Sequence, residues 1–254
     1  MPRQEFRRGS DARERIVKAI MEQRVSTNSL PDRRHVKRYL QQYFAHVPYE
    51  DLEGRPESLM ARAALDHLEF GKSRRKNQAL LRVFNPSESK NGYESSFTFV
   101  EVINDDMPFL VNSLLAAISR RDLGIHMTIH PVLRVERDGR GRLKGIPAPS
   151  RSGGTTESWI RIAVDKETDP ADLKALHDEL ERVLSDVRRA VTDWEAMRHK
   201  MEVACEDLEA TDPGGAPDLK AESAELLRWL VDEHFTFLGY REYRLFERGQ
   251  RTFL

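Results

Sequence analysis

One stretch of the sequence, from residue 173 to residue 208, repeats apolar side chains every seven residues over five heptads. Its first series is Leu173, Leu180, Val187, Trp194, Met201 and Leu208. A second series lies three residues later in each repeat: Leu176, Val183, Ala190, Met197 and Ala204. A double heptad series of this length predicts one unbroken helix of about 60 Å, at 1.5 Å per residue, that begins at Pro170.

The apolar stripe of this helix is wider in its first half, where Leu184 and Val191 add to it. We therefore expect the first half to cover a sheet and the second half to project as a narrower seam. The seam supplies four oligomerisation candidates, which are Trp194, Met197, Met201 and Leu208. The spacing leaves open whether they join a second copy of the chain or pack on helices of the same chain.

Charge and cysteine content exclude several classes of protein. With 41 basic and 42 acidic residues the net charge is -1, which predicts no general attraction to nucleic acid or to anionic membranes. The basic stretch from Lys72 to Lys76 is interpreted as a solvated linker. The single cysteine, Cys205, can form neither an internal disulfide nor a cysteine metal site, which fits a reducing cytoplasm. The sequence also shows no secretion signal and no apolar run that predicts a membrane helix.

The period of the apolar residues changes along the chain. An N-terminal helical region is expected over residues 1–75, with helices near residues 11–25, from Pro31-Asp32 onward, and over residues 59–71. Strands are predicted at residues 79–84, 96–103, 125–136 and 157–164, and a helix at residues 107–121. Residues 138–154 are expected to form a turn and a mobile loop.

The order of these elements predicts an α+β fold. Without the first strand the order is β-α-β-β-α, which is a ferredoxin-like βαββαβ unit lacking its last strand. The strand at residues 79–84 can take that place as a hairpin partner. Residues 76–194 are therefore expected to form a circularly permuted, four-stranded antiparallel sheet with two helices on one face, packed against the N-terminal helices.

Beyond that domain, residues 195–234 are expected to continue the long helix, to bend at a hinge over residues 212–217 and to end in a helix over residues 219–231. Residues 235–246 are predicted to be a strand, followed by a turn at residues 247–249. Because the return strand would stop at Leu254, residues 235–254 are interpreted as the truncated start of another β module, and the chain as a fragment of a longer protein.

The turn Asn104-Asp105-Asp106, between a strand and a helix, is a candidate ligand site. The free N–H groups and the dipole at the start of a helix attract anions such as a carboxylate. The same residues are expected to cap the helix through Asp105 or Asp106. Their two carboxylates would repel an anion unless an amine or a cation accompanied it.

His126 and His130 suggest a metal site, but their spacing argues against one. Four residues of a strand span about 13 Å, whereas zinc–nitrogen bonds are about 2 Å long, so one ion cannot contact both rings. We expect both to be polar residues on an open sheet face. If that face meets a second sheet instead, they would titrate near neutrality in an interface.

No catalytic or cofactor site is predicted. The glycines Gly139, Gly141 and Gly145 do not have the Gly-x-Gly-x-x-Gly spacing of a nucleotide loop, and no helix is predicted to follow them. The sequence also lacks a nucleophile–base arrangement, so neither catalytic residues nor a metal are assigned to this chain.

The segment from Val102 to Val111, together with residues 123–126, resembles the signature of ACT domains. These small regulatory units bind amino acids where the first strand turns into the first helix. Asp106 and Pro108 match the usual Asp-x-Pro, and Gly124-Ile125 matches the usual Gly-Ile, but the usual glycine after the proline is Phe109, which would fill the ligand space. The resemblance implies an effector site formed by Asn104, Asp105, Asp106, Met107, Phe109, Val111, Gly124, Ile125 and His126.

A longer resemblance covers nearly the whole chain. The segments 43–52, 104–108, 126–132 and 235–241 are similar to the amino terminus of the large bacterial NAD-specific glutamate dehydrogenases. The resemblance implies an intact protein that deaminates glutamate to 2-oxoglutarate and ammonium with NAD, at a site hundreds of residues further on.

From this resemblance the chain is expected to be a non-catalytic regulatory and assembly segment, without a cofactor of its own. Its expected partners are the remaining domains of its own chain, further copies in a homo-oligomer and an amino-acid effector, in the cytoplasm. The alternative is a purely architectural oligomerisation arm that binds no small molecule. Nucleic acid and membranes are not expected partners.

Overall fold

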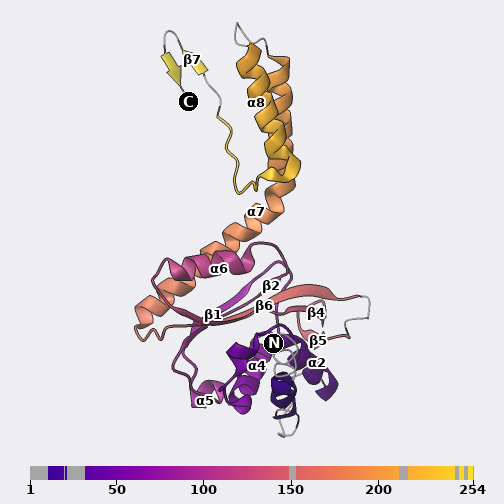
Figure 1. Ribbon diagram of the computed structural model, residues 1–254, viewed down its shortest axis with the longest axis vertical. Helices are drawn as coiled ribbons and strands as arrows, with labels where there is room; N and C mark the ends of the chain where they lie inside the picture. Colours follow the sequence, from indigo (N-terminus) through magenta and orange to yellow (C-terminus); the bar gives the residue numbers. More distant parts are fainter. Residues whose placement is uncertain are drawn as a thin grey trace, which may run out of the picture. The chain divides into compact units, whose positions relative to one another are not determined.

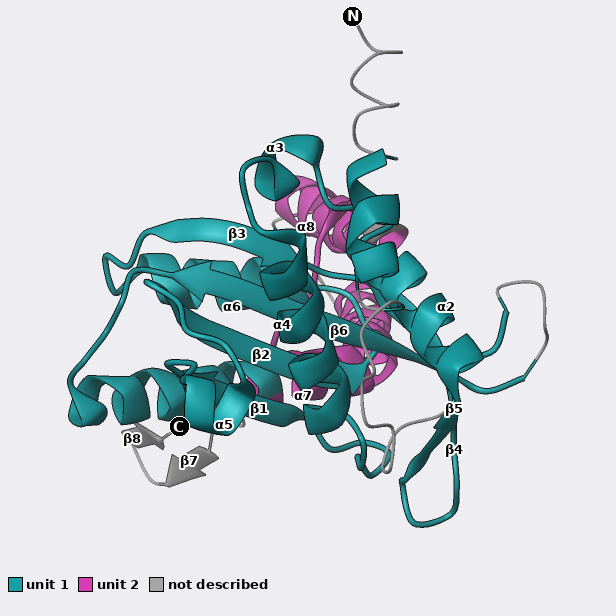
Figure 2. Cartoon of the chain, turned by 90° about the horizontal axis from the view of Figure 1, so that it is seen from below, with its two compact units in different colours: residues 1–184 teal, residues 185–254 magenta. Residues whose placement is uncertain are grey.

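The structure, a computed structural model, describes residues 11–19, 21, 32–148, 153–211, 217–243, 246–248 and 251–253. Two compact units make up the chain, residues 1–184 and residues 185–254 (Figure 2). The helices before residue 75 belong to the same unit as the sheet because they share one hydrophobic cluster with it. The predicted four-segment division, with boundaries at residues 75, 194 and 234, stays a prediction.

The N-terminal region is helical, as predicted. Residues 11–19 and 21 are helical, and α2 (Arg33–Tyr43), α3 (Tyr49–Leu52) and α4 (Glu57–Phe70) follow. Asp32 caps α2, since its side chain accepts hydrogen bonds from the backbone N–H groups of Arg34 and His35. Pro31 and residues 22–25, which belong to the predicted helices, lie outside the described residues.

One antiparallel sheet forms the centre of the first unit. Its strands are β1 (Leu80–Phe84), β2 (Thr98–Asp105), β3 (Ile125–Ile129), β4 (Val132–Arg137), β5 (Leu143–Gly145) and β6 (Thr155–Val164). The order is β1-β2-β6-β4-β5, and β3 also pairs with β6. One edge of β6 pairs with β2 along its length, and the other edge pairs first with β4 and then with β3.

The prediction of four strands is wrong, because the sheet has six. The predicted strand at residues 125–136 is interrupted between β3 and β4, where Pro131 has no N–H to donate to the sheet. The loop expected at residues 138–154 contains the strand β5. A short helix, α5 (Glu88–Asn91), lies in a different loop, the one before β2. Residues 149–152, part of that expected loop, lie outside the described residues.

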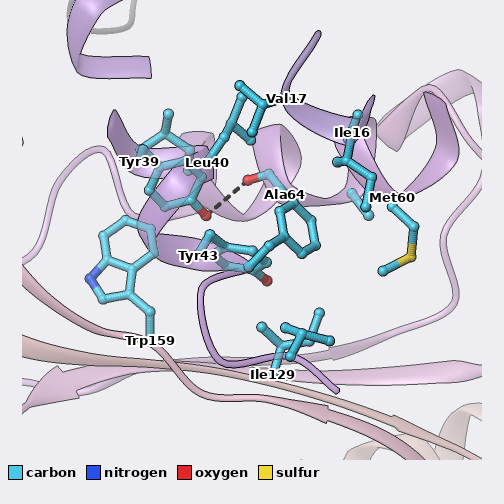
Figure 3. Close-up of a cluster of buried hydrophobic side chains, with 14 of the residues drawn as sticks. Ile16, Val17, Tyr39, Leu40, Tyr43, Met60, Ala64, Ile129 and Trp159 are labelled. Atoms are coloured by element: carbon cyan, nitrogen blue, oxygen red, sulfur yellow. Dashed lines mark hydrogen bonds between the residues drawn. The ribbon is translucent and has the colours of Figure 1, made fainter. Parts of the chain in front are cut away.

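Helices cover both faces of this sheet (Figure 1). The helix α6 (Leu110–Ser119) and the first part of α7 (Pro170–Ala210) lie on one face, and α2 and α4 lie on the other. On the α2–α4 face, Tyr39, Tyr43, Met60 and Ala64 pack toward Ile129 and Trp159, and the Tyr39 hydroxyl donates to the Ala64 carbonyl over 2.9 Å (Figure 3). No face of the sheet is open as a whole, but His126 and His130 are both exposed, as expected for polar residues of this stretch.

The long helix is confirmed. The helix α7 runs without interruption from Pro170 to Ala210, 41 residues, and the first-half residues Leu176, Leu180 and Leu184 are buried. The second unit also contains α8 (Pro217–Trp229) and a π-helix, η1 (Leu230–His234). The predicted hinge falls on residues 212–216, which lie outside the described residues.

The predicted strand at residues 235–246 is wrong. Residues 236–243 form neither helix nor strand, and a short hairpin pairs β7 (Phe246–Arg248) with β8 (Arg251–Phe253) instead. Alternating apolar residues favour a strand only when a partner strand is available, and none pairs with residues 236–243 in the described part of the chain. Gly249, in the predicted turn, lies outside the described residues.

Candidate functional site

The turn that joins β2 to α6 holds most of the predicted effector residues. Phe109 occupies the N-cap of α6 in the left-handed region, with φ 70°, and its side chain makes no capping hydrogen bond. Phe109 is 44% exposed, so part of its side chain lies in solvent. Near it Met107 and Val111 are half-buried and Asn104 is buried.

The prediction that Asp105 or Asp106 caps α6 is wrong, because both carboxylates contact partners from distant parts of the chain. Asp106 accepts a hydrogen bond from the Ser158 hydroxyl over 2.6 Å, and its backbone N–H donates to the Thr156 carbonyl over 3.1 Å. Asp105 accepts from the Arg74 guanidinium over 2.7 Å and from the Asn77 backbone N–H over 3.1 Å. These contacts attach the turn to β6 and to the segment after α4.

His130, Ser158 and Asp106 form a chain of hydrogen bonds with the three residue types of a hydrolase triad. His130 Nε2 lies 3.1 Å from Ser158 Oγ. Because the Ser158 proton points to Asp106, the imidazole must donate to the hydroxyl rather than accept from it. Burial lowers the pKa of His130, and Asp106 opposes that shift. Ser158 thus lies between the histidine and the carboxylate, whereas in a hydrolase triad the histidine lies between the serine and the carboxylate, so this arrangement does not activate the serine.

A buried ion cluster lies beside this turn. The carboxylate of Glu157 accepts from Arg74 (Nε 3.0 Å), from Arg137 (Nε 2.8 Å) and from the Trp159 indole N–H (3.2 Å). Arg74 is 2% exposed, so the interpretation of residues 72–76 as a solvated linker is wrong for Arg74, whereas Arg75 and Lys76 are exposed as expected. With Asp105 the cluster contains two cations and two anions. Each buried charge therefore has a partner of opposite sign, as the burial of charged groups requires.

The other predicted effector residues lie at the opposite end of β6. Gly124 donates its backbone N–H to Asp165 over 2.7 Å, and His126 Nε2 lies 2.7 Å from the other Asp165 oxygen. These two hydrogen bonds hold the pKa of Asp165 below its usual range. His126 also lies against Phe97, with ring centroids 4.6 Å apart, and Ile125 is 37% exposed rather than buried as its place in the alternation predicted.

The structure thus does not bring the nine predicted effector residues into one cluster. In the sheet register Asp105 lies opposite Glu157, and Ile125 lies opposite Val164. The stretch of β6 between Glu157 and Val164 spans about 23 Å. His126 and His130 have separate partners, Asp165 and Ser158.

The four oligomerisation candidates lie on the half of α7 that α8 packs against. Met197 is 7% exposed and Trp194, Met201 and Leu208 are half-buried. Cys205 Sγ lies 3.7 Å from the Ala224 carbonyl, and Lys220 Nζ donates to the Glu209 carbonyl over 2.6 Å. The seam is therefore covered in part by the same chain.

Sequence reasoning missed two features. Large apolar side chains of the second unit are exposed: Leu219, Leu226, Trp229, Phe235, Leu238, Tyr240 and Tyr243. The spacing of Leu219, Leu226 and Trp229 on one face of a helix was the available signal. The second feature is the fully buried ion pair of Glu101 with Arg161, signalled by a charged residue in the middle of each apolar strand.

Metal and membrane sites find no support in the described ranges. No group of three or more His, Cys, Asp or Glu side chains there could hold a metal ion. Among the same residues, no helix is both long and apolar enough to cross a membrane. Gly139 and Gly141 lie in the turn after β4, and Gly145 ends β5.

Comparison with known proteins gives consistent matches. Residues 39–180 match the family described as "Glutamate dehydrogenase, ACT1 domain". Three relatives carry the name NAD-specific glutamate dehydrogenase: one from Halomonas elongata, 35% identical over 93% of this chain and 15% of that protein; one from Pseudomonas aeruginosa, 32% identical over 89% and 14%; and one from Mycobacterium tuberculosis, 28% identical over 75% and 12%. The chain therefore spans only about a seventh of the length of these relatives.

Proposed function

Because this chain belongs to the family of glutamate dehydrogenase ACT1 domains, we propose that it is the non-catalytic regulatory and assembly segment of an NAD-dependent glutamate dehydrogenase. The proposal assigns to the intact protein the conversion of glutamate, NAD and water into 2-oxoglutarate, ammonium and NADH in the cytoplasm. NAD would bind elsewhere in that protein. The names of three relatives support this assignment.

The exposed apolar face of α8 is the observation that carries the assembly role. Leu219 is 65% exposed, Leu226 is 56% exposed and Trp229 is 50% exposed. Positions seven and three residues apart lie on one face of a helix, so these three side chains form one stripe, the α8 stripe. A stripe of large apolar side chains left in water marks an interaction surface. A second copy of the chain is the partner that we propose for it.

The mass of the chain in solution, measured by light scattering, tests this role. We expect a multimer that dissociates in the Leu219→Gln/Leu226→Gln double variant, because two amides would be buried without partners. Glu225→Gln is the matched control on the same helix, since Glu225 is exposed beside the stripe, and it should leave the mass unchanged. A monomeric starting protein, or an unchanged mass in the double variant, would contradict the assembly role.

The sheet order supports a permuted ferredoxin-like arrangement. If β3 and β4 count as one interrupted strand, the order β1-β2-β6-β3/β4 corresponds to the order 4-1-3-2 of a βαββαβ unit, with β1 in the place of the last strand. All neighbours in this order are antiparallel, as that unit requires. We include the permutation in the proposal.

Sensing of an amino acid is the regulatory half of the proposal, and the backbone of Phe109 favours it. A bulky residue held in the left-handed region is strained, and such strain concentrates at functional turns. A ligand that contacts both the 104–111 turn and residues 124–126 would need a second copy, because about 23 Å of β6 separates them. Calorimetric titration with each standard amino acid tests this half. If none gives heat, the purely architectural alternative holds.

A further inference from the structure

A cavity of about 280 Å³ lies between α4 and the sheet, on the face opposite α6 and α7. Its roof includes Ala63 and Ala64 of α4, and Met127 and Ile129 of β3 belong to its wall. Methyl side chains on the helix opposite an edge strand leave the space unfilled. Figure 3 shows Met60, Ala64 and Tyr43 on the helical side and Ile129 on the sheet side of this region. The volume is nearly twice the roughly 150 Å³ apolar cavity that holds a benzene molecule.

The cavity contains one buried cation, Arg161 of β6, which is 1% exposed. Its guanidinium lies over the Phe99 ring, 3.9 Å from the centroid, donates to Glu101, and donates to the Tyr93 hydroxyl over 2.8 Å. Those two hydrogen bonds use two of the five N–H groups of a guanidinium. Arg161 and Tyr93 therefore present polar groups beside the apolar side chains that α4 and β3 contribute to the cavity.

The charges behind Arg161 are balanced by a chain of ion pairs. Glu101 also accepts from Arg82 over 2.7 Å, and Arg82 donates to Asp66 over 2.6 Å. Burial raises the pKa of Asp66, and its ion pair with Arg82 opposes that shift.

Two loops also line the cavity. Gly54 and Arg55 come from the loop before α4, and residues 93–97 come from the loop before β2. Arg55 lies 6.0 Å from the centroid of the Phe97 ring, and Lys166 holds the second loop by donating to the Ser95 carbonyl over 2.8 Å. The lining therefore contains two guanidinium groups and one carboxylate, Glu94.

We propose that this cavity binds a small carboxylic acid with an apolar body, whose carboxylate pairs with Arg161 and Tyr93. A carboxylate matches the planar fork of a guanidinium and makes charge-assisted hydrogen bonds to it. The alanines of α4 and the β3 side chains would contact the apolar body. The site lies on the opposite face of the sheet from α6 and is independent of the proposed sensing turn at residues 104–111.

Calorimetric titration of the 254-residue chain with compounds on one carbon skeleton tests this inference. The probes are 4-methylpentanoate, its neutral amide 4-methylpentanamide, 4-methyl-2-oxopentanoate and L-leucine. We expect 4-methylpentanoate to bind with Kd of about 1 mM or tighter, and the amide to bind about tenfold more weakly or worse, because it loses the charge-assisted bonds. Comparing the affinity of the oxo acid with that of L-leucine then shows whether the site prefers a simple carboxylic acid or an amino acid. Equal affinity of acid and amide, or heat with no probe, would overturn the inference.

A variant that fills the cavity locates the binding. Ala63→Leu keeps a good helix former in α4 and places a larger side chain in the cavity, so binding of 4-methylpentanoate should fall at least about tenfold. Ala175→Leu is the matched control, because Ala175 is exposed on α7, and it should bind as the starting protein does. The melting temperature of each variant shows that it is folded. If folded Ala63→Leu binds with unchanged affinity, the acid binds elsewhere and the inference fails.

Discussion

Arg74 and Glu157, 83 residues apart in the sequence, form a buried ion pair in which the guanidinium donates to one carboxylate oxygen through Nε at 3.0 Å and Nη2 at 2.8 Å. The pair joins the segment after α4 to the start of β6. Arg137 donates to the same carboxylate from the end of β4. The Glu157 side chain thus connects three parts of the first unit: the segment after α4, the end of β4 and the start of β6.

Glu157→Gln should therefore destabilise the protein by about 3 kcal/mol, because it leaves two buried guanidinium groups with one anion fewer. Urea unfolding followed by circular dichroism should show a lower midpoint with an unchanged slope. Glu69→Gln removes an exposed ion pair with Lys72 instead and should cost less than about 1 kcal/mol. Equal costs for the two variants would show that the buried cluster contributes no more than a surface pair.

Phe109→Gly should stabilise the protein by about 1 kcal/mol. The φ of 70° at Phe109 is unfavourable for a bulky side chain and is freely adopted by glycine. Phe109 is 44% exposed, which limits the burial that is lost when the ring is removed. Asp122→Gly is the matched control, because Asp122 also has positive φ, at 56°, but aspartate tolerates this region. Thermal unfolding should show a larger gain for Phe109→Gly than for Asp122→Gly, and a loss of stability would show that the ring is needed.

Patterns local in the sequence predicted much of the fold. The heptad series gave α7 with its start at Pro170, and short runs of branched and aromatic residues gave β1, β2 and β6. Each depends on neighbours within a few residues, so periodicity is enough to detect it. The break at Pro131 was missed, although proline cannot donate to a sheet and its position was a local signal.

Features set by distant residues could not be predicted in the same way. Asp105 and Asp106 follow a strand and precede a helix, which favours capping, yet Arg74 and Ser158 compete for their carboxylates. Nothing local indicates that a residue 31 positions away in the chain will contact Asp105. The lack of a strand over residues 236–243 depends likewise on the absence of a partner strand among the described residues.

Val187→Pro should cost about 3 kcal/mol or more and reduce the helical signal in circular dichroism. Val187 lies near the middle of α7, where proline removes a backbone hydrogen bond and clashes with the preceding turn. Ala171→Pro places the same residue in the first turn of α7, where only the bond from the Ala171 N–H to Asp169 is lost, at a cost of about 1 kcal/mol. Similar losses for the two variants would contradict a continuous, cooperative α7.

His67 is a buried histidine that is expected to make stability depend on pH. Its ring is 0% exposed, and Nδ1 lies 3.0 Å from the Tyr43 hydroxyl. Nε2 is buried and has no hydrogen-bond partner among the described residues. Burial first, and then the positive charges of Arg161 and Arg82, hold the pKa of His67 well below its usual 6.5.

In the unfolded chain His67 takes up a proton near pH 6.5, but in the folded protein it stays neutral to a lower pH. The unfolded state therefore binds more protons in that interval, so the free energy of unfolding is highest above pH 6.5 and falls as the pH is lowered. One such group contributes a slope of about 1.4 kcal/mol per pH unit. His67→Gln should reduce the slope between pH 6.5 and pH 5 by that amount in urea titrations, whereas His46→Gln, at an exposed position, should leave it unchanged. An identical slope in both variants would mean that His67 is protonated in the folded protein over this range.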